Sequence, residues 1–180
     1  SHQGFVAMLH PVKYVNVNSF IKEDREQSLV LMLDNISDPQ NFGAILRSAA
    51  FFNVDLVIWS RNRGSNLSPI ACKTSCGASE LVPLSEVSNI YNAMLAFQKG
   101  GYTIITSQLS EDASSLYDFE FPNKSVIILG SEEKGVQGLI SKKTDESIII
   151  PVTGKVQSLN VSQAASVILA SYHLKQGHGV

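Results

Sequence analysis

Short polar side chains gather in three stretches of this sequence, and each stretch follows an apolar run. Ser158 and Asn160 stand where the last helical segment begins, and Asn41 stands where an earlier one begins. Glu132 lies in the glycine-flanked run Gly130-Ser-Glu-Glu-Lys-Gly. The first backbone amides of a helix lack partners within the helix, and beside short polar side chains they suit a small polar ligand. These stretches are therefore the candidate functional site.

The elements that must position these side chains are short strands that alternate with helices. Buried strands are predicted over residues 29–34, 56–59, 102–106, 126–129 and 147–150. The main helices are predicted over residues 41–53, 84–99 and 161–175. This alternation predicts an α/β domain with a mostly parallel sheet and helices on both faces. Since the carboxyl ends of parallel strands share one edge, the three polar stretches predict a single site there.

Composition and charge limit the classes of function. The chain has 180 residues, 44% of them hydrophobic, and no repeat or linker, which predicts one globular domain with a sizeable core. A formal net charge of −2 gives no overall basic field, so a nucleic acid partner would need local basic patches. No apolar run is long enough to span a membrane and no signal-peptide pattern opens the chain. We expect a protein of a reducing compartment.

Metal and disulfide chemistry are not expected. The four histidines lie near the two ends of the chain, away from the polar stretches. Cys72 and Cys76 are four residues apart in a helix or turn, where a disulfide has poor geometry and no histidine completes a zinc site. They are predicted to be free thiols, and no metal-ligating residues are assigned.

The common nucleotide-binding motifs are absent. The turn after residues 29–33 lacks Gly-x-Gly-x-x-Gly, and no Gly-x-x-x-x-Gly-Lys-Ser/Thr sequence occurs. The glycine-flanked loop that contains Glu132 and Glu133 would repel a polyphosphate. The loops suit a ligand that carries an adenine, a ribose, an ammonium group and a cationic centre, and S-adenosylmethionine is one candidate among several.

The three stretches resemble the sequence motifs of the SpoU branch of the SPOUT superfamily, the RNA ribose 2′-O-methyltransferases. The matching runs are Asp38-Pro-Gln-Asn-Phe-Gly-Ala-Ile-Leu-Arg, Ile128-Leu-Gly-Ser-Glu-Glu-Lys-Gly and Ile149-Ile-Pro-Val-Thr-Gly-Lys-Val-Gln-Ser-Leu-Asn-Val-Ser. The resemblance covers residues from about 29 to 175 and is greatest to the catalytic domain of the large-subunit rRNA guanosine methyltransferases. It implies a leader over residues 1–28 packed on a methyltransferase domain over residues 29–180. A small RNA-binding domain precedes that domain in those relatives and is expected to be missing from this chain.

The resemblance also implies a SPOUT fold with a deep trefoil knot in the C-terminal half, a homodimer with the site near its interface, and S-adenosylmethionine as the cofactor. Carried over to this sequence, the cofactor-binding positions are Gly130, Ile150, Leu159, Ser107, Ser158 and Asn160.

The catalytic positions implied by the resemblance are Asn41, Arg47, Glu132, Ser158 and Asn160. Arg47 stands six residues after Asn41, and we expect both on roughly the same face of their helix. Because arginine stays protonated in proteins, we favour phosphate binding by Arg47 over removal of the ribose hydroxyl proton. Each position also has a simpler interpretation: Asn41, Ser158 and Asn160 as helix caps, and Glu132 as a carboxylate that shapes the pocket.

The expected substrate is a guanosine of large-subunit rRNA. Arg47, Arg61, Arg63 and Lys73 are the predicted RNA-binding residues, with Lys134 and Lys155 as further candidates for a basic rim. The alternatives are a tRNA ribose methyltransferase of the same branch and a non-catalytic RNA-binding relative. The expected location is the cytoplasm, or an organelle if a targeting segment has been removed.

Overall fold

The protein has a parallel β-sheet at its centre. The computed structural model describes residues 12–108, 110, 112–131, 134–156 and 158–177. In this part of the chain the strands are β1 (Ser28–Asp34), β2 (Leu56–Ser60), β3 (Leu84–Val87), β4 (Thr103–Ser107), β5 (Ser114–Ser115), β6 (Lys124–Gly130) and β7 (Glu146–Ile149). They form one seven-stranded sheet of order β3-β2-β1-β6-β4-β7-β5, in which every strand pairing is parallel. The predicted α/β class and parallel sheet are confirmed.

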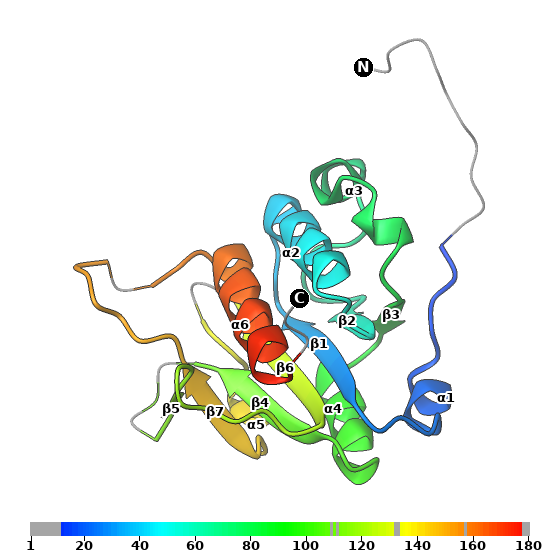
Figure 1. Ribbon diagram of the computed structural model, residues 1–180. Helices are drawn as coiled ribbons and strands as arrows, with labels where there is room; N and C mark the ends of the chain where they lie inside the picture. The colour runs from blue at the N-terminus through cyan, green and yellow to red at the C-terminus, as the bar shows by residue number, and fades with distance from the viewer. Residues whose placement is uncertain (1–11, 109, 111, 132–133, 157, 178–180) are drawn as a thin grey trace.

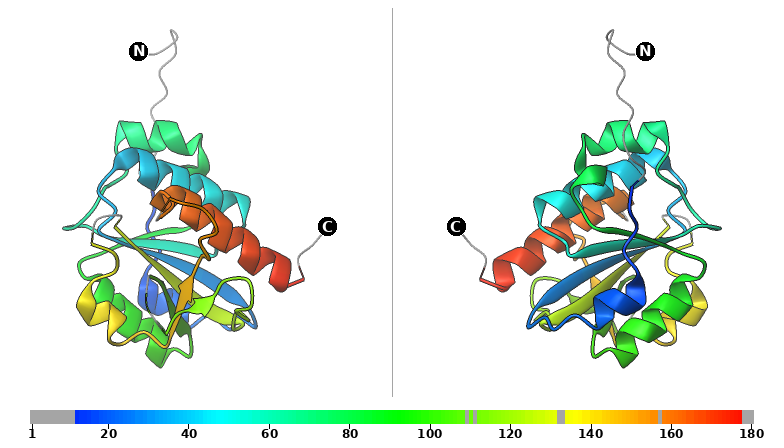
Figure 2. Two further views of the ribbon diagram at one scale, coloured as in Figure 1. Left: turned by 90° about the vertical axis from the view of Figure 1, so that its left-hand side faces the viewer. Right: turned by 90° about the vertical axis from the view of Figure 1, so that its right-hand side faces the viewer.

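Helices cover both faces of this sheet. They are α1 (Val17–Ile21), α2 (Pro39–Phe51), α3 (Pro69–Ser75), α4 (Ile90–Lys99), α5 (Gly138–Ser141), α6 (Val161–Lys175) and the 3-10 helix η1 (Ala78–Glu80). Helices α2, α3 and α6 lie on one face, and α1, α4 and α5 lie on the other (Figures 1 and 2). Within the described residues, none of these helices combines the length and the apolar character needed to cross a membrane.

Strand β1 is the centre of two hydrophobic cores, one on each face of the sheet. Leu31 and Leu33 pack with Phe42 of α2, whereas Val30 and Met32 belong to the core beneath α4. All seven residues of β1 are buried, and each fully buried large apolar side chain stabilises the fold by about 1.5–3 kcal/mol. The short apolar run therefore forms a strand because both of its faces are covered.

Two predicted segments differ from the structure. The helix predicted over residues 84–99 is wrong in its first part, because Leu84 pairs with Val57 of β2 and the residues that follow form the edge strand β3. Asn89 then caps α4 by accepting a hydrogen bond from the Asn92 backbone amide at 3.2 Å. The polar segment before β1 contains α1, whose buried Phe20 is an apolar anchor that is not predicted from the sequence.

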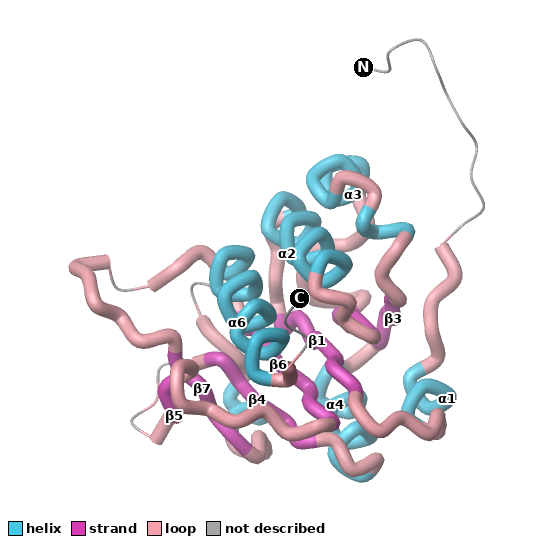
Figure 3. Tube along the Cα trace, viewed as in Figure 1, coloured by secondary structure: helices cyan, strands magenta, loops and turns pink. Residues whose placement is uncertain are grey.

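After β7 the chain leaves the sheet, and α6 then packs beside α2 on one face of the sheet. The connection from β7 to α6 projects away from the sheet before α6 begins, as the tube trace shows (Figure 3). At the far end of α6, the Lys175 Nζ donates hydrogen bonds to the carbonyls of Tyr117 and Phe119, at 2.8 and 3.0 Å. The trefoil knot stays a prediction of the family resemblance, and the strand order is consistent with it.

Candidate functional site

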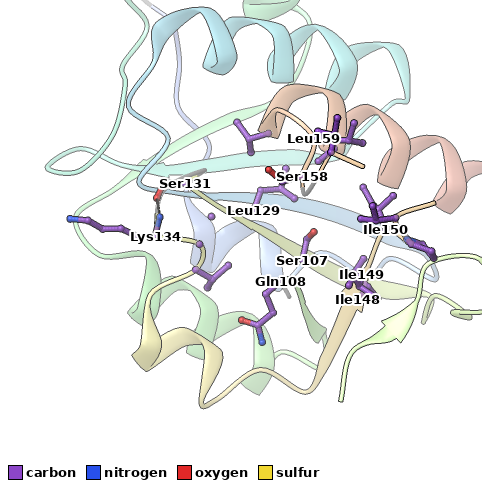
Figure 4. Close-up of a pocket in the computed structure, with 18 of the residues that line it drawn as sticks. Ser107, Gln108, Leu129, Ser131, Lys134, Ile148, Ile149, Ile150, Ser158 and Leu159 are labelled. Atoms are coloured by element: carbon purple, nitrogen blue, oxygen red, sulfur yellow. Dashed lines mark hydrogen bonds between the residues drawn. The ribbon is translucent and has the colours of Figure 1, made fainter. Parts of the chain in front are cut away.

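A cavity of about 660 Å³ lies where β4, β6 and β7 reach the carboxyl edge of the sheet. Ser107 lines it from the end of β4, Ile150 from the residue after β7, and Ser158 from the approach to α6 (Figure 4). The remaining lining comes from the loop after β6, the connection from β7 to α6, and the first turns of α6. This volume is typical of small-molecule sites in proteins. Segments far apart in the sequence thus form one concave site.

The wall that follows β6 depends on the absence of a side chain at Gly130. A Cβ at this position would lie 2.1 Å from the carbonyl carbon of Gly135 and 2.3 Å from its oxygen. The loop folds back because the Gly135 amide donates to the Ser131 carbonyl at 2.8 Å and the Ser131 amide donates to the Gly135 carbonyl at 3.2 Å. Gly135 itself has a φ of +64°, which glycine adopts readily. The two glycines therefore form the narrow turn beside the cavity.

The opposite wall ends at the N-terminus of α6. Asn160 caps this helix, since its Oδ1 accepts hydrogen bonds from the Ser162 amide at 2.9 Å and from the Ser162 Oγ at 2.6 Å. Ser158 and Leu159, directly before the cap, line the cavity. The N-terminal end of a helix carries partial positive charge and favours electron-rich ligand groups. The capping interpretation of Asn160 is confirmed, and the cap stands at the edge of the cavity.

Asn41 contacts this cap from the other polar stretch. Its Oδ1 accepts a hydrogen bond of 2.9 Å from the Asn160 Nδ2. The interpretation of Asn41 as the cap of α2 is wrong, because Asp38 caps that helix through the Gln40 amide at 2.9 Å. Pro39 then begins the helix, and Asn41 lies inside its first turn. Its side chain thereby joins the start of α2 to the start of α6.

The chain matches the model of the SpoU rRNA Methylase family over residues 28–170. It belongs to this family. It is 36% identical over 171 residues to the 23S rRNA (guanosine-2′-O-)-methyltransferase RlmB of Photobacterium profundum, which covers 94% of this chain and 69% of that protein. It is also 36% identical over 178 residues to an uncharacterized tRNA/rRNA methyltransferase of Borreliella burgdorferi, covering 93% of this chain and 77% of that protein.

Solved structures of SpoU and TrmH proteins have the same fold. A putative RNA methyltransferase of the TrmH family from Porphyromonas gingivalis superposes with a TM-score of 0.74 at 27% identity, covering 83% of this chain and 61% of that one. The SpoU methyltransferase AviRb from Streptomyces viridochromogenes, solved in complex with AdoMet, superposes with a TM-score of 0.78. Its identity is 22%, with 89% of this chain and 65% of that chain covered, so this likeness concerns the fold alone.

The structure brings most of the cofactor positions expected from the SpoU family to the cavity. Its lining includes Gly130, Ile150, Leu159, Ser107 and Ser158. Asn160 stands next to this lining as the α6 cap, and Glu132 lies outside the described residues. Gln108 also lines the cavity, although it is not among the predicted positions; its Nε2 donates to the Ser147 Oγ at 3.0 Å and its Oε1 accepts from the Ser141 Oγ at 3.0 Å. The sequence signal that could have identified Gln108 is its position directly after Ser107, at the end of a predicted strand.

Arg47 lies on another side of α2 from Asn41. The expectation that the two share a face is wrong, because six residues at 3.6 residues per turn place them about 120° apart around the helix. The Arg47 Nη1 donates a hydrogen bond of 3.5 Å to the Sγ of Cys76, just after α3, and Arg47 is not among the described residues that line the cavity. Cys72 and Cys76 are free thiols, as predicted. Arg47 therefore borders the α2–α3 surface.

Arg61, Arg63 and Lys73 also lie outside the described lining of the cavity, whereas the further candidates Lys134 and Lys155 are part of it. The Arg61 Nε donates to the Glu86 carboxylate at 2.7 Å, and the Arg63 Nη1 donates to the Gln137 Oε1 at 2.7 Å. Both arginines are exposed in the loop after β2, and Lys73 is exposed on α3. No group of three or more His, Cys, Asp or Glu side chains suited to a metal ion occurs in the described part of the chain.

Proposed function

We propose that this protein transfers a methyl group from S-adenosylmethionine to a ribose 2′-hydroxyl of RNA. The observation that carries the proposal is the cavity at the carboxyl edge of the sheet, with the Asn41–Asn160 hydrogen bond beside it. Membership of the SpoU rRNA methylase family and the similarity to RlmB support this reaction over other uses of the same cavity.

The described lining suits S-adenosylmethionine. Leu129, Leu159 and Val161 provide apolar surface for a nucleoside base, and the backbones of Gly130 and Ile150 provide hydrogen-bonding groups beside them. The side-chain-free turn at Gly130 permits close approach to backbone atoms. We propose that these residues hold the cofactor, which when bound would supply an activated methyl group.

The chemistry requires little more than positioning. Bound S-adenosylmethionine would supply a methyl group activated by its sulfonium and would leave as S-adenosylhomocysteine, while the ribose 2′-hydroxyl would release its proton to water. Leu129 and Leu159 are apolar surface from which bound cofactor and RNA would displace water, and the linked Asn41 and Asn160 amides would orient polar groups at the edge of the cavity. Alignment and desolvation of this kind account for a large part of such rate enhancements.

Arg47 is proposed to bind an RNA phosphate rather than to remove the proton. It is exposed at the α2–α3 surface, where Lys73 of α3 supplies a second cation. A guanidinium binds phosphate through paired N–H donors and stays protonated, so it is a poor proton acceptor. The two cations fit the edge of an RNA-binding surface outside the cavity.

Large-subunit rRNA is the proposed substrate, with guanosine as the nucleotide, because RlmB proteins carry that name. A tRNA substrate is the alternative, favoured by relatives named tRNA/rRNA methyltransferases. Calorimetric titration with S-adenosylmethionine, with NAD as a control, tests the cofactor. Transfer of labelled methyl groups to large-subunit rRNA or tRNA transcripts then distinguishes the substrates, and cofactor binding without transfer to either would favour a non-catalytic relative.

We propose a homodimer that covers the C-terminal ends of α2 and α6, which are the ends opposite to Asn41 and Asn160, whereas the family resemblance implies an interface near the site. Phe51 and Leu174 are 81% and 73% exposed at the C-terminal ends of these neighbouring helices, where large apolar side chains gain from burial. Sedimentation at micromolar concentration should show a dimer, and Phe51→Asp with Leu174→Asp should shift it toward the monomer. A wild-type monomer would overturn this part of the proposal.

A further inference from the structure

The loop after β2 and the wall of the cavity are joined through one glutamine. The Gln137 backbone amide donates to the Asp34 Oδ2 at 2.7 Å, and the Gln137 Nε2 donates to the Asp34 Oδ1. The Gln137 Oε1 accepts from the Arg63 Nη1 at 2.7 Å. Three segments that are distant in sequence therefore meet at a single primary amide.

Asp34 is the fixed end of this connection. It ends β1, it is 1% exposed, and it stands opposite Gly130 of β6 in the sheet register. The salt bridges among the described residues do not include Asp34, and the two N–H groups of Gln137 are its hydrogen-bond donors there. A buried carboxylate without donors is costly, so Asp34 favours the conformation that keeps Gln137 in place.

Gln137 directly follows the wall that borders the cavity. Ser131, Lys134, Gly135 and Val136 line the cavity, and the next residue is held to β1 through Asp34. Fixing Gln137 therefore fixes the end of the wall. The position of this wall determines the shape of the site that we propose for the cofactor.

Arg63 is the exposed end of the same connection. Its loop is anchored to the segment after β1, because the Ser65 amide donates to the Ile36 carbonyl at 2.5 Å. Gly64 has a φ of +108°, and a Cβ there would lie 2.9 Å from that carbonyl oxygen. An arginine carries five N–H donors, so the bond to Gln137 leaves others for an RNA phosphate. Arg63 can contact Gln137 and a phosphate at the same time.

A primary amide suits this position because it donates and accepts at once. Its nitrogen serves the buried carboxylate of Asp34, and its oxygen serves the guanidinium of Arg63. A glutamate would keep the acceptor for Arg63 but would place a second negative charge beside Asp34, and an alanine would remove both side-chain contacts.

We propose that Gln137 is a positioning residue that couples RNA contact at Arg63 to the described cavity wall, which is formed by residue 131 and residues 134–136. When a phosphate fixes the position of Arg63, the hydrogen bond from Arg63 keeps Gln137 in contact with Asp34. When a bound cofactor fixes the wall, Gln137 stays in the position from which it accepts the hydrogen bond of Arg63. RNA and cofactor therefore strengthen each other's binding, by the same factor in both directions. This inference rests on the proposed function.

The test measures the affinity for a large-subunit rRNA transcript with and without saturating S-adenosylhomocysteine, which has no methyl group to transfer. In the wild type we expect the ligand to tighten RNA binding by about fivefold or more. In Gln137→Ala, Gln137→Glu and Arg63→Ala, the factor by which the ligand tightens RNA binding should fall below about twofold. The double variant that carries Gln137→Ala and Arg63→Ala should show no greater loss of coupling than Arg63→Ala alone.

Arg61→Ala is the matched control. Arg61 is exposed in the same loop as Arg63, but its guanidinium pairs with Glu86 instead of Gln137. Its loss can weaken RNA binding, yet the coupling factor should stay at the wild-type value.

Three results would overturn the inference. The inference is wrong if the wild type binds RNA and ligand without coupling, or if Arg63→Ala keeps the full coupling. Either result would leave the proposed function intact. A folded wild type that binds neither would overturn the proposed function together with this inference.

Discussion

The Asn160 Nδ2 lies 2.9 Å from the Asn41 Oδ1, although 119 residues separate the two asparagines in sequence. Because the Asn160 Oδ1 already accepts from Ser162, the nitrogen is the atom that faces Asn41. One amide thus caps α6 and holds its first turn to the first turn of α2. Capping and site formation are two consequences of the same side chain.

An Asn160→Asp substitution separates these two roles. Aspartate caps helices as well as asparagine does, so the free energy of unfolding should change by less than about 1 kcal/mol. The donor to Asn41 is lost and two oxygens face each other, so methyl transfer should fall by about tenfold or more, since about 1.4 kcal/mol corresponds to a factor of ten. Urea unfolding and transfer rates measure the two effects, and unchanged transfer would reduce Asn160 to a cap.

A Gly130→Ala substitution should destroy the wall after β6. The new Cβ would meet the backbone of Gly135 at 2.1 Å, so the loop must move. We expect affinity for S-adenosylmethionine to fall by more than about tenfold, with a loss of stability of about 1–3 kcal/mol. Gly138→Ala is the control, because a Cβ there meets nothing within 4 Å. Calorimetry showing equal cofactor affinity in the two variants would contradict the cavity's assignment.

Arg47→Ala should lower methyl transfer by about 10- to 150-fold, because one charged contact to the acceptor is worth about 1.5–3 kcal/mol. The affinity for S-adenosylmethionine should stay within about twofold of the wild type. The reason is its position on the α2–α3 surface, outside the described lining of the cavity. Arg47→Lys keeps the charge but not the paired donors and should recover only part of the activity. A large loss of cofactor affinity in Arg47→Ala would refute the RNA-binding role.

Tyr172 makes stability depend on pH in the alkaline range. Burial, with a smaller contribution from Asp55, raises the pKa of Tyr172 to about 12 from an ordinary value of 10.0. Between these two pH values the unfolded chain loses the phenol proton while the folded chain keeps it, so stability falls as pH rises through this window. Relative to Tyr172→Phe, wild-type stability should decrease by up to about 2 kcal/mol from pH 9 to 12. Urea unfolding at several pH values measures this difference, and a constant difference would contradict the shift.

Much of the fold followed from local patterns. The run from Leu29 to Leu33 is apolar at every position. This pattern is typical of a strand that is covered on both faces of the sheet, and it predicts β1. The sequence predicts a helix over Leu84–Val87 because these four residues carry no strong strand signal of their own. They form β3 because the edge of β2 is available for pairing, and this partner is visible only in three dimensions.

The candidate site was predictable to the extent that it follows strand ends. Ser107, Gly130 and Ile150 stand at or directly after the ends of three strands, and the order of the strands brings them together. Gln137 and its contacts to Asp34 and Arg63 could not be predicted, because they depend on which loops are neighbours across the sheet edge. The error over Arg47 had a simpler cause, since helical periodicity alone separates it from Asn41.

The most direct test of the account is to identify the nucleoside that receives the methyl group. The wild type would be incubated with labelled S-adenosylmethionine and a large-subunit rRNA transcript, and the RNA would be hydrolysed with alkali. A methyl group on the ribose 2′-oxygen removes the nucleophile that alkali needs, so the account predicts label in an alkali-resistant dinucleotide that yields 2′-O-methylguanosine. Label on a base, or none from a folded protein that binds the cofactor, would contradict it.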